Sequence, residues 1–315
     1  MKQELLVTMA AVLIVGAGCT RPDATIGTAK NPLSLVFIPG RDKAVVEASA
    51  RAVAAFLEKD AGLVTRVSVP PRYIDAIAGL SEGKGADVAF LNDFGYLLAR
   101  EEYGAKVLLK VVRGDGRTSY RGAVVARADG PIARLADLAG RKVAFADPYS
   151  TAGFVLTIKL IKDAGVTPGA TLFAKGHDAV VRMVYEGKAD AGAIFASPVD
   201  GDDARRGVER ELPDVMKKVK VVAYTDEVPN EPVVFRRGLP PELAVKVAAS
   251  LSRFAETPGG GIALGDLSGI TGFKAATDAD YDGLRKTLRV IGKDVADMVP
   301  GGWELAIRNE PLKLD

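Results

Sequence analysis

Cysteine, histidine and tryptophan each occur only once among the 315 residues of this chain. A single cysteine cannot form a disulfide within the chain, so the folded domain must be stabilised by its hydrophobic core, which a chain of this length can build. The formal net charge is only +2 at pH 7. Such a weak charge excludes the broad basic surface of a nucleic-acid-binding protein, so any anion site must be local. A composition with 48% hydrophobic and 26% charged residues is typical of a globular protein.

An apolar run at residues 5–18 ends directly before the only cysteine, Cys19. The run is too short for a comfortable membrane-spanning helix and has the length of a signal-peptide core. Small residues followed by a cysteine resemble a bacterial lipobox, in which the cysteine receives a lipid. We therefore predict a signal peptide at residues 1–18, lipidation of Cys19, and a polar tether over residues 19–31 that holds the protein at the periplasmic face of the cell envelope. A plain signal peptide, which would release the protein into the periplasm, or an N-terminal membrane anchor stays the alternative.

Beyond residue 32, strand-like and helix-like patterns alternate along the chain. Apolar runs such as residues 33–38 and 107–112 predict buried strands, and amphipathic stretches such as residues 241–255 and 281–291 predict helices. This βαβ series predicts an α/β fold with parallel sheets covered by helices.

Two polar breaks divide the series, one at residues 114–119 and one at the Pro-Asn-Glu-Pro stretch of residues 229–232. We predict two lobes joined by two crossings: lobe 1 at residues 32–113 plus 232–315, lobe 2 at residues 120–230, and hinge regions at residues 114–119 and 224–232. Ligands of open α/β sheets bind outside the carboxyl ends of the strands. In a two-lobed protein those ends face a cleft, which hinge closure can bury.

One segment, the Asp-Pro-Tyr-Ser-Thr-Ala-Gly stretch of residues 147–153, follows an apolar strand at residues 142–146 and precedes a helix-like run at residues 154–164. Two hydroxyls and free backbone N–H groups therefore meet at a helix start, where the first amides lack partners and carry partial positive charge. Such a start is suited to a small oxyanion such as phosphate, phosphonate or sulfonate. An ordinary helix cap uses the same residue types and is the alternative.

This motif, together with other segments in one order along the chain, resembles the phosphate-, phosphite- and phosphonate-binding proteins of ABC importers, the PhnD-like branch of the type 2 periplasmic binding fold. The matching segments are residues 120–129, 135–146, 147–153, 176–177, 189–193, 228–239 and 267–285. The resemblance implies two lobes, each a mostly parallel sheet flanked by helices. It also implies a solute-binding protein, not an enzyme, that serves an ABC permease and its ATPase. We expect a monomer that needs no cofactor or metal.

The resemblance assigns the oxyanion site position by position. The family holds its phosphonyl group with a Ser-Thr pair and the next amide, which correspond here to Ser150, Thr151 and the N–H of Ala152. The family's histidine corresponds to His177, whose alternative role is to cap the following helix. Phe195 stands where aminophosphonate binders often carry an acid, and a phenyl ring cannot pair with an ammonium group. We therefore expect phosphite, methylphosphonate or a similar small anion.

Four further residues are candidates for the ligand site. The family's aromatic positions correspond to Tyr73 and Tyr120, which half-buried structural tyrosines would equally explain. Asn92 and Asp93 follow a predicted strand and can supply polar contacts. Asp93 can accept a proton from a protonated oxyanion, which would favour a monoanion, or it can cap the helix that begins near Phe94.

Other functions on the same pattern remain open. A sensor that presents its ligand to a membrane kinase, or a binder of sulfonates or pyrimidines, would use the same scaffold. A hydrolase is disfavoured because the chain has no Gly-x-Ser-x-Gly elbow and no evident third triad member. The acidic stretch at residues 200–203 resembles a calcium loop but lacks its ligand spacing and closing glutamate, so we predict a solvated turn.

Overall fold

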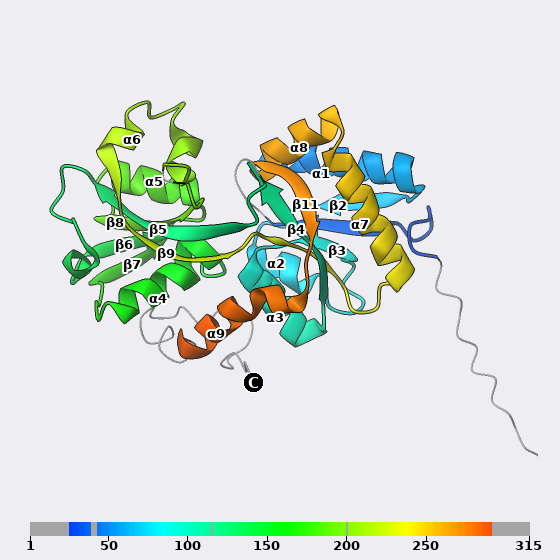
Figure 1. Cartoon of the computed structure of the whole chain (residues 1–315), viewed down its shortest axis with the longest axis horizontal. Helices are drawn as coiled ribbons and strands as arrows, with labels where there is room; N and C mark the ends of the chain where they lie inside the picture. Colours follow the sequence, from blue (N-terminus) through cyan, green and yellow to red (C-terminus); the bar gives the residue numbers. More distant parts are fainter. Residues whose placement is uncertain (1–24, 39–42, 115, 200, 292–315) are drawn as a thin grey trace, which may run out of the picture.

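The computed structural model describes residues 25–38, 43–114, 116–199 and 201–291. These residues form two α/β lobes side by side, each with one sheet and with helices packed on it (Figure 1). The predicted signal peptide and Cys19 lie outside the described residues. Within the described part of the chain, no helix has both the length and the apolar character that a membrane span requires.

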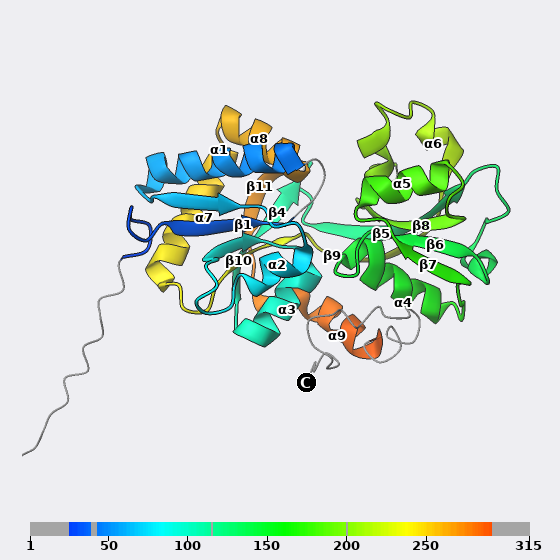
Figure 2. The same cartoon turned by 180° about the vertical axis from the view of Figure 1, so that it is seen from behind.

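The first lobe is built on a six-stranded sheet with the order β11-β4-β10-β3-β1-β2. Its strands are β1 (Leu33–Phe37), β2 (Thr65–Ser68), β3 (Val88–Phe90), β4 (Lys106–Arg113), β10 (Pro232–Phe235) and β11 (Ile270–Ala275). Its helices are α1 (Lys43–Ala61), α2 (Tyr73–Ala78), α3 (Asp93–Tyr103), α7 (Pro241–Ala255), α8 (Pro258–Ser268), the 3₁₀ turn η4 (Asp278–Tyr281) and α9 (Asp282–Ile291). Every residue of β1 and β3 is buried, because helices cover both faces of the sheet (Figure 2).

The second lobe is built on a five-stranded sheet with the order β7-β6-β8-β5-β9. Its strands are β5 (Ser119–Arg127), β6 (Lys142–Phe145), β7 (Ala170–Phe173), β8 (Ala191–Ala196) and β9 (Val219–Pro229). Its helical segments are η1 (Leu135–Leu138), the π-helical turn η2 (Thr151–Val155), α4 (Leu156–Asp163), α5 (His177–Tyr185), η3 (Ala204–Val208) and α6 (Val215–Lys218).

The strands of each sheet run mostly in one direction, with exceptions that follow from the crossings. β1 is parallel to β2 and β3, and β6 is parallel to β7 and β8. β10 is antiparallel to β3 and β4, β11 is antiparallel to β4, and β5 is antiparallel to β8 and β9. Each sheet is thus mostly parallel, as predicted, and β5 and β10 run against their neighbours because each enters its sheet directly from the other lobe.

Two extended segments connect the lobes, from β4 into β5 and from β9 into β10 (Figures 1 and 2). β9 continues to Pro229, which pairs with Ser119 at the start of β5. The strand therefore runs through most of the stretch at residues 224–232 that the sequence predicted as a hinge, because pairing with β5 satisfies its backbone groups.

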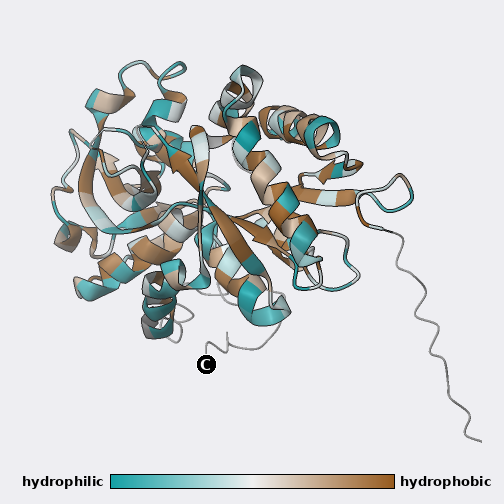
Figure 3. Cartoon of the chain, turned by 45° about the vertical axis from the view of Figure 1, so that its right-hand side comes forward, coloured by the Kyte–Doolittle hydropathy of each residue, from teal (hydrophilic) through white to brown (hydrophobic). Residues whose placement is uncertain are grey.

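One hydrophobic cluster reaches from the first lobe into the second. It includes Phe94 of α3, Phe154 and Ile158 of the helix after β6, and Leu284 and Leu288 of α9. α9 lies against both α3 and α4 (Figure 1). Apolar residues follow the strands, and hydrophilic residues lie on the outer helices (Figure 3). The junction of the lobes is therefore packed as a core around the polar groups described below.

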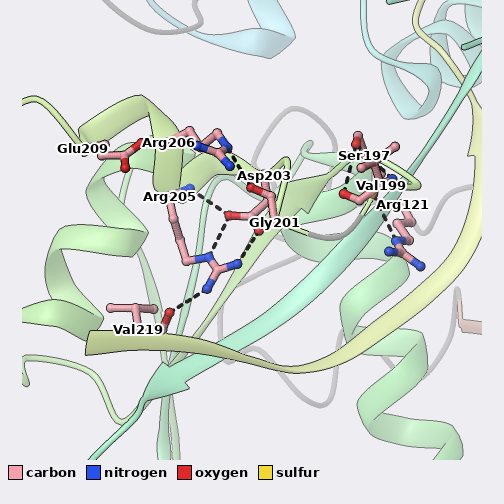
Figure 4. A network of polar contacts seen from close by, with 9 residues as sticks. All are labelled: Arg121, Ser197, Val199, Gly201, Asp203, Arg205, Arg206, Glu209 and Val219. Carbon is pink, nitrogen blue, oxygen red and sulfur yellow. Dashed lines mark hydrogen bonds and ion pairs between the residues drawn. The ribbon is translucent and has the colours of Figure 1, made fainter. Parts of the chain in front are cut away.

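The acidic stretch after β8, predicted to be a solvated turn, differs from that prediction at Asp203. The Asp203 side chain is fully buried and caps η3 by accepting from Arg205 N at 3.0 Å. The Arg205 guanidinium donates to both Asp203 carboxylate oxygens, at 2.8 and 2.7 Å, and to Val219 O at 2.6 Å (Figure 4). This paired arrangement fixes the edge of the second lobe, because a buried carboxylate needs such partners.

Candidate functional site

The predicted oxyanion motif forms the start of a helix in the second lobe. β6 ends at Phe145, a turn follows, and η2 begins at Thr151 and continues into α4. Ser150 caps this helix by accepting from Gly153 N at 3.1 Å. The N–H groups of Thr151 and Ala152 have no hydrogen-bond partner among the described residues. The helix start therefore presents two free donors at the positive end of its dipole.

His177 lies beside this helix start and has a defined orientation. It is the first residue of α5, whose cap is Gly176, so the alternative that His177 caps the helix is wrong. Its Nδ1 accepts from Phe195 N at 3.1 Å, which places the proton of the neutral ring on Nε2. Nε2 lies 3.5 Å from Ser150 Oγ, and the Phe195 ring stands edge-on to the imidazole with centroids 5.3 Å apart.

The Ser150 hydroxyl is thereby prepared to donate. A serine hydroxyl has one hydrogen and two acceptor positions. Gly153 N and His177 Nε2 both approach Oγ from the acceptor side, so the hydroxyl hydrogen is left for a third partner. Gly153 permits this approach, because a Cβ there would lie 2.8 Å from His177 Cε1 and 2.6 Å from Ala146 Cβ.

A second helix start, from the first lobe, meets the first. Asn92 caps α3 by accepting from Gly95 N at 2.7 Å, so the alternative that Asp93 is the cap is wrong. The Asn92 amide also donates to Tyr149 O at 2.8 Å, and Phe94 N donates to Thr151 Oγ1 at 3.0 Å. These two bonds join the lobes directly at the predicted site.

Asp93 is the first residue of α3 and lies at the centre of this junction. It is 0% exposed, and its Oδ2 accepts from Tyr120 OH at 2.8 Å. Burial raises the Asp93 pKa well above its ordinary value; the negative charge of Glu231 adds to this, while the Tyr120 bond and the Arg113 charge oppose it. Burial likewise raises the pKa of Tyr120, which also shares a hydrogen bond with Thr151.

An ion pair that the sequence did not suggest lies behind Asp93. Arg113 at the end of β4 and Glu231 between β9 and β10 bind through two contacts of 2.5 and 3.0 Å. They come from the two crossings, 118 residues apart in the chain. The only sequence signal for this pair was the position of its members, with Arg113 directly before one predicted break and Glu231 inside the other.

Tyr73 and Tyr149 lie on the rim of the junction. Tyr73 begins α2, and burial together with the charges of Asp147 and Glu231 raises its pKa, which places it within electrostatic reach of both carboxylates. Tyr149 stacks on Phe94 with ring centroids 6.1 Å apart, and burial raises its pKa to about 12. Burial also raises the pKa of Asp147, whose Oδ1 accepts from Tyr149 N at 2.8 Å.

The structure thus places all eight predicted ligand residues at this junction. Tyr73 differs from the others in that its side chain makes no hydrogen bond to another described residue. The two arginines next to the tyrosines have other partners: Arg72 pairs with Asp75, and Arg121 lies 3.5 Å over the Tyr224 ring. Among the described residues, no group of three or more His, Cys, Asp or Glu side chains is arranged to hold a metal ion.

Two surface cavities lie elsewhere. One, of about 240 Å³, is lined by Ser34, Arg66 and Lys84 among others, and the second, of about 330 Å³, borders Arg127 and Ile132. Neither includes a predicted ligand residue, because the two helix starts are in direct contact and their side chains are buried. Chemically, the junction offers several donors to an anion without a full countercharge.

Comparison with known proteins places the chain among transport proteins. Residues 35–281 match the family of periplasmic substrate-binding proteins of phosphonate ABC transporters. The phosphate-import protein PhnD of Mycolicibacterium smegmatis is 29% identical over 320 residues, which covers 92% of this chain and 97% of the relative.

Solved structures share the fold. A binding-protein component of a phosphonate ABC transporter from Pseudomonas aeruginosa superposes with a TM-score of 0.72 at 19% identity, covering 84% of this chain and 89% of the other. A protein from Prochlorococcus marinus, solved in complex with methylphosphonate, gives a TM-score of 0.70 at 17% identity, covering 83% and 98%. Both support the two-lobed architecture.

Proposed function

The chain belongs to the family of periplasmic substrate-binding proteins of phosphonate ABC transporters, and from this premise we propose that it captures a small phosphorus oxyanion between its lobes and delivers it to an ABC permease and its ATPase. Phosphite, methylphosphonate and phosphate are the ligands of this class. The observation that carries the proposal is the convergence of free donors at the start of η2.

Four donors in the second lobe can hold the oxygens of such a ligand. They are the free N–H groups of Thr151 and Ala152, the Ser150 hydroxyl, and the Nε2–H of His177, whose long 3.5 Å contact with Ser150 Oγ a ligand oxygen can replace. A buried oxyanion loses its hydration and needs several convergent hydrogen bonds in return. Because Asp93 lies nearby, a ligand that can carry a proton is favoured over one with the maximum negative charge.

The first lobe closes over the ligand. Asn92 and Phe94 contact Tyr149 and Thr151 across the junction, so both helix starts belong to one closed arrangement. Rotation about the two crossings separates these pairs and admits the ligand, and its oxygens then take the place of direct contacts such as Phe94 N to Thr151 Oγ1. Tyr73 and Tyr120 border this space.

The side of the site near Phe195 selects against an amine. Phe195 is an apolar neighbour of His177, where an ammonium group would need a carboxylate. We therefore propose that methylphosphonate or phosphite binds more tightly than 2-aminoethylphosphonate.

Isothermal titration calorimetry with phosphite, methylphosphonate, phosphate, 2-aminoethylphosphonate and methanesulfonate tests this function. We expect saturable binding of at least one phosphorus oxyanion and weaker binding of the aminophosphonate. A folded protein that binds none of the phosphorus compounds contradicts the proposal.

We further propose that the protein is anchored to the membrane through a lipid on Cys19. The support is the sequence pattern of residues 5–19 alone. Cells fed with labelled palmitate should label the wild-type protein and not Cys19→Ser. Equal labelling of both, or of neither, contradicts the anchor.

A further inference from the structure

Two buried side-chain oxygens among the described residues lack a hydrogen-bond partner, and one of them is Asp93 Oδ1. Asp93 is fully buried, and its other oxygen is already bound to Tyr120 OH at 2.8 Å. Oδ1 is therefore available for a further hydrogen bond at the junction where the free donors of the second lobe converge. A native protein rarely leaves such an oxygen unsatisfied without a functional reason.

A carboxyl group differs from the amide and hydroxyl donors at this junction, because an oxyanion can approach it only through a proton. Two unprotonated oxygens repel each other, so one proton must lie between Asp93 Oδ1 and any ligand oxygen next to it. The proton can come from the ligand as a P–OH group, or from Asp93 as a neutral carboxylic acid. In both cases the closed complex holds one proton shared by the two groups.

We infer, on the basis of the proposed function, that Asp93 determines specificity because the closed site requires one proton shared between Asp93 and the ligand. Asp93 thereby discriminates against oxyanions that carry no proton at neutral pH, such as sulfonates. A phosphorus monoanion brings this proton. A sulfonate does not, so Asp93 must take one up from solution when the lobes close.

The surroundings of Asp93 support this requirement. The ionisable groups that face it are Tyr120 from β5, Glu231 and Arg113 from the crossings, and Tyr281 from η4. Arg113 is engaged by Glu231 through two contacts, so it is a poor counterion for Asp93. Burial and Glu231 together raise the Asp93 pKa in the closed arrangement, whereas an open cleft hydrates the carboxyl and returns it towards its ordinary value.

The size of the effect follows from the distance between the working pH and the ordinary pKa of an aspartate. An aspartate with its ordinary pKa of about 3.9 is about three decades from protonation at pH 7. Closure over a sulfonate therefore loses on the order of a hundredfold to a thousandfold in affinity, and the loss grows about tenfold per pH unit. A phosphorus monoanion avoids this loss up to its own second pKa.

The test measures affinity for methylphosphonate and methanesulfonate at pH 5, 6 and 7 in the wild type, in Asp93→Asn and in Asp163→Asn, a half-exposed carboxylate at the far end of α4. An asparagine donates through its Nδ2 without a titrating proton and still accepts from Tyr120. We expect methanesulfonate affinity to fall about tenfold per pH unit in the wild type and in Asp163→Asn. In Asp93→Asn we expect it to rise and to lose this slope.

Calorimetry in buffers of different ionisation heat gives a second readout on the wild type. We expect uptake of about one proton with methanesulfonate at pH 6 and almost none with methylphosphonate. Any slope common to the wild type and Asp93→Asn does not arise from Asp93. If Asp93→Asn keeps the wild-type discrimination and slope, or if the wild type takes up no proton with the sulfonate, the inference is overturned. If the wild type binds no phosphorus oxyanion at all, it is the proposed function that fails.

Discussion

Replacing Ser150 with alanine separates two roles of one hydroxyl. Ser150 Oγ caps the helix by accepting from Gly153 N at 3.1 Å, and its own hydrogen is available to a ligand. Loss of a cap lowers the free energy of unfolding by about 1 kcal/mol. Loss of a hydrogen bond to a charged ligand lowers the binding free energy by about 1.5–3 kcal/mol, which corresponds to a roughly 10- to 150-fold higher Kd.

The matched control is Thr257→Ala. Thr257 caps α8 in the same way, with its Oγ1 accepting from Gly260 N at 3.0 Å, and α8 belongs to the outer layer of the first lobe. Both variants should lose a similar free energy of unfolding in urea titrations, because each removes one cap. Only Ser150→Ala should lose affinity in calorimetric titrations with methylphosphonate or phosphite. Equal ligand affinity in the two variants refutes the assignment of Ser150 as a ligand donor.

Three further changes follow from the same geometry. Asn92→Asp keeps a good helix cap but replaces the amide that donates to Tyr149 O with an oxygen. Ligand affinity should therefore fall about tenfold, and small-angle scattering should show a less closed complex. An unchanged affinity contradicts this prediction. Gly153→Ala places a methyl group against His177 and should weaken ligand binding more than Gly259→Ala does, because Gly259 is a helical glycine with open space around it. Equal ligand affinities of the two variants speak against the contact between residue 153 and His177. Folding raises the Asp93 pKa, so the folded protein retains a proton that the unfolded chain releases above the ordinary pKa of an aspartate. The stability of the wild type relative to Asp93→Asn should therefore be greatest in acid and fall as the pH rises towards neutrality. Urea midpoints of the two proteins that differ by the same amount at pH 4 and pH 8 contradict this prediction.

Strong local patterns were enough to predict several elements from the sequence. The helix predicted at residues 241–255 coincides with α7, because a proline begins it and apolar residues repeat along one face. α8 and β11 were missed, because the run of three glycines after Pro258 is typical of a loop. The helix after β6 was predicted to begin at Phe154, but it begins at Thr151, since its first turn is π-helical and opens with the small residues Thr151, Ala152 and Gly153.

The site residues were predicted better than their contacts. Ser150, Thr151 and His177 follow from a compact motif and one distant histidine, and the structure brings them together. The partner of Asp93 could not be predicted, because Tyr120 reaches it only through the crossing from β4 to β5. The caps were misassigned for the same reason: Asn92 and Asp93 are adjacent, and only backbone geometry decides which side chain turns back to the helix.

The most direct test of the central claim is a crystal structure of the protein in complex with methylphosphonate. The account predicts that the phosphonate oxygens lie within hydrogen-bond distance of Thr151 N, Ala152 N and Ser150 Oγ, with one oxygen next to Asp93 Oδ1 and the lobes closed. A ligand bound away from the start of η2, or one whose oxygens contact neither free amide, contradicts it.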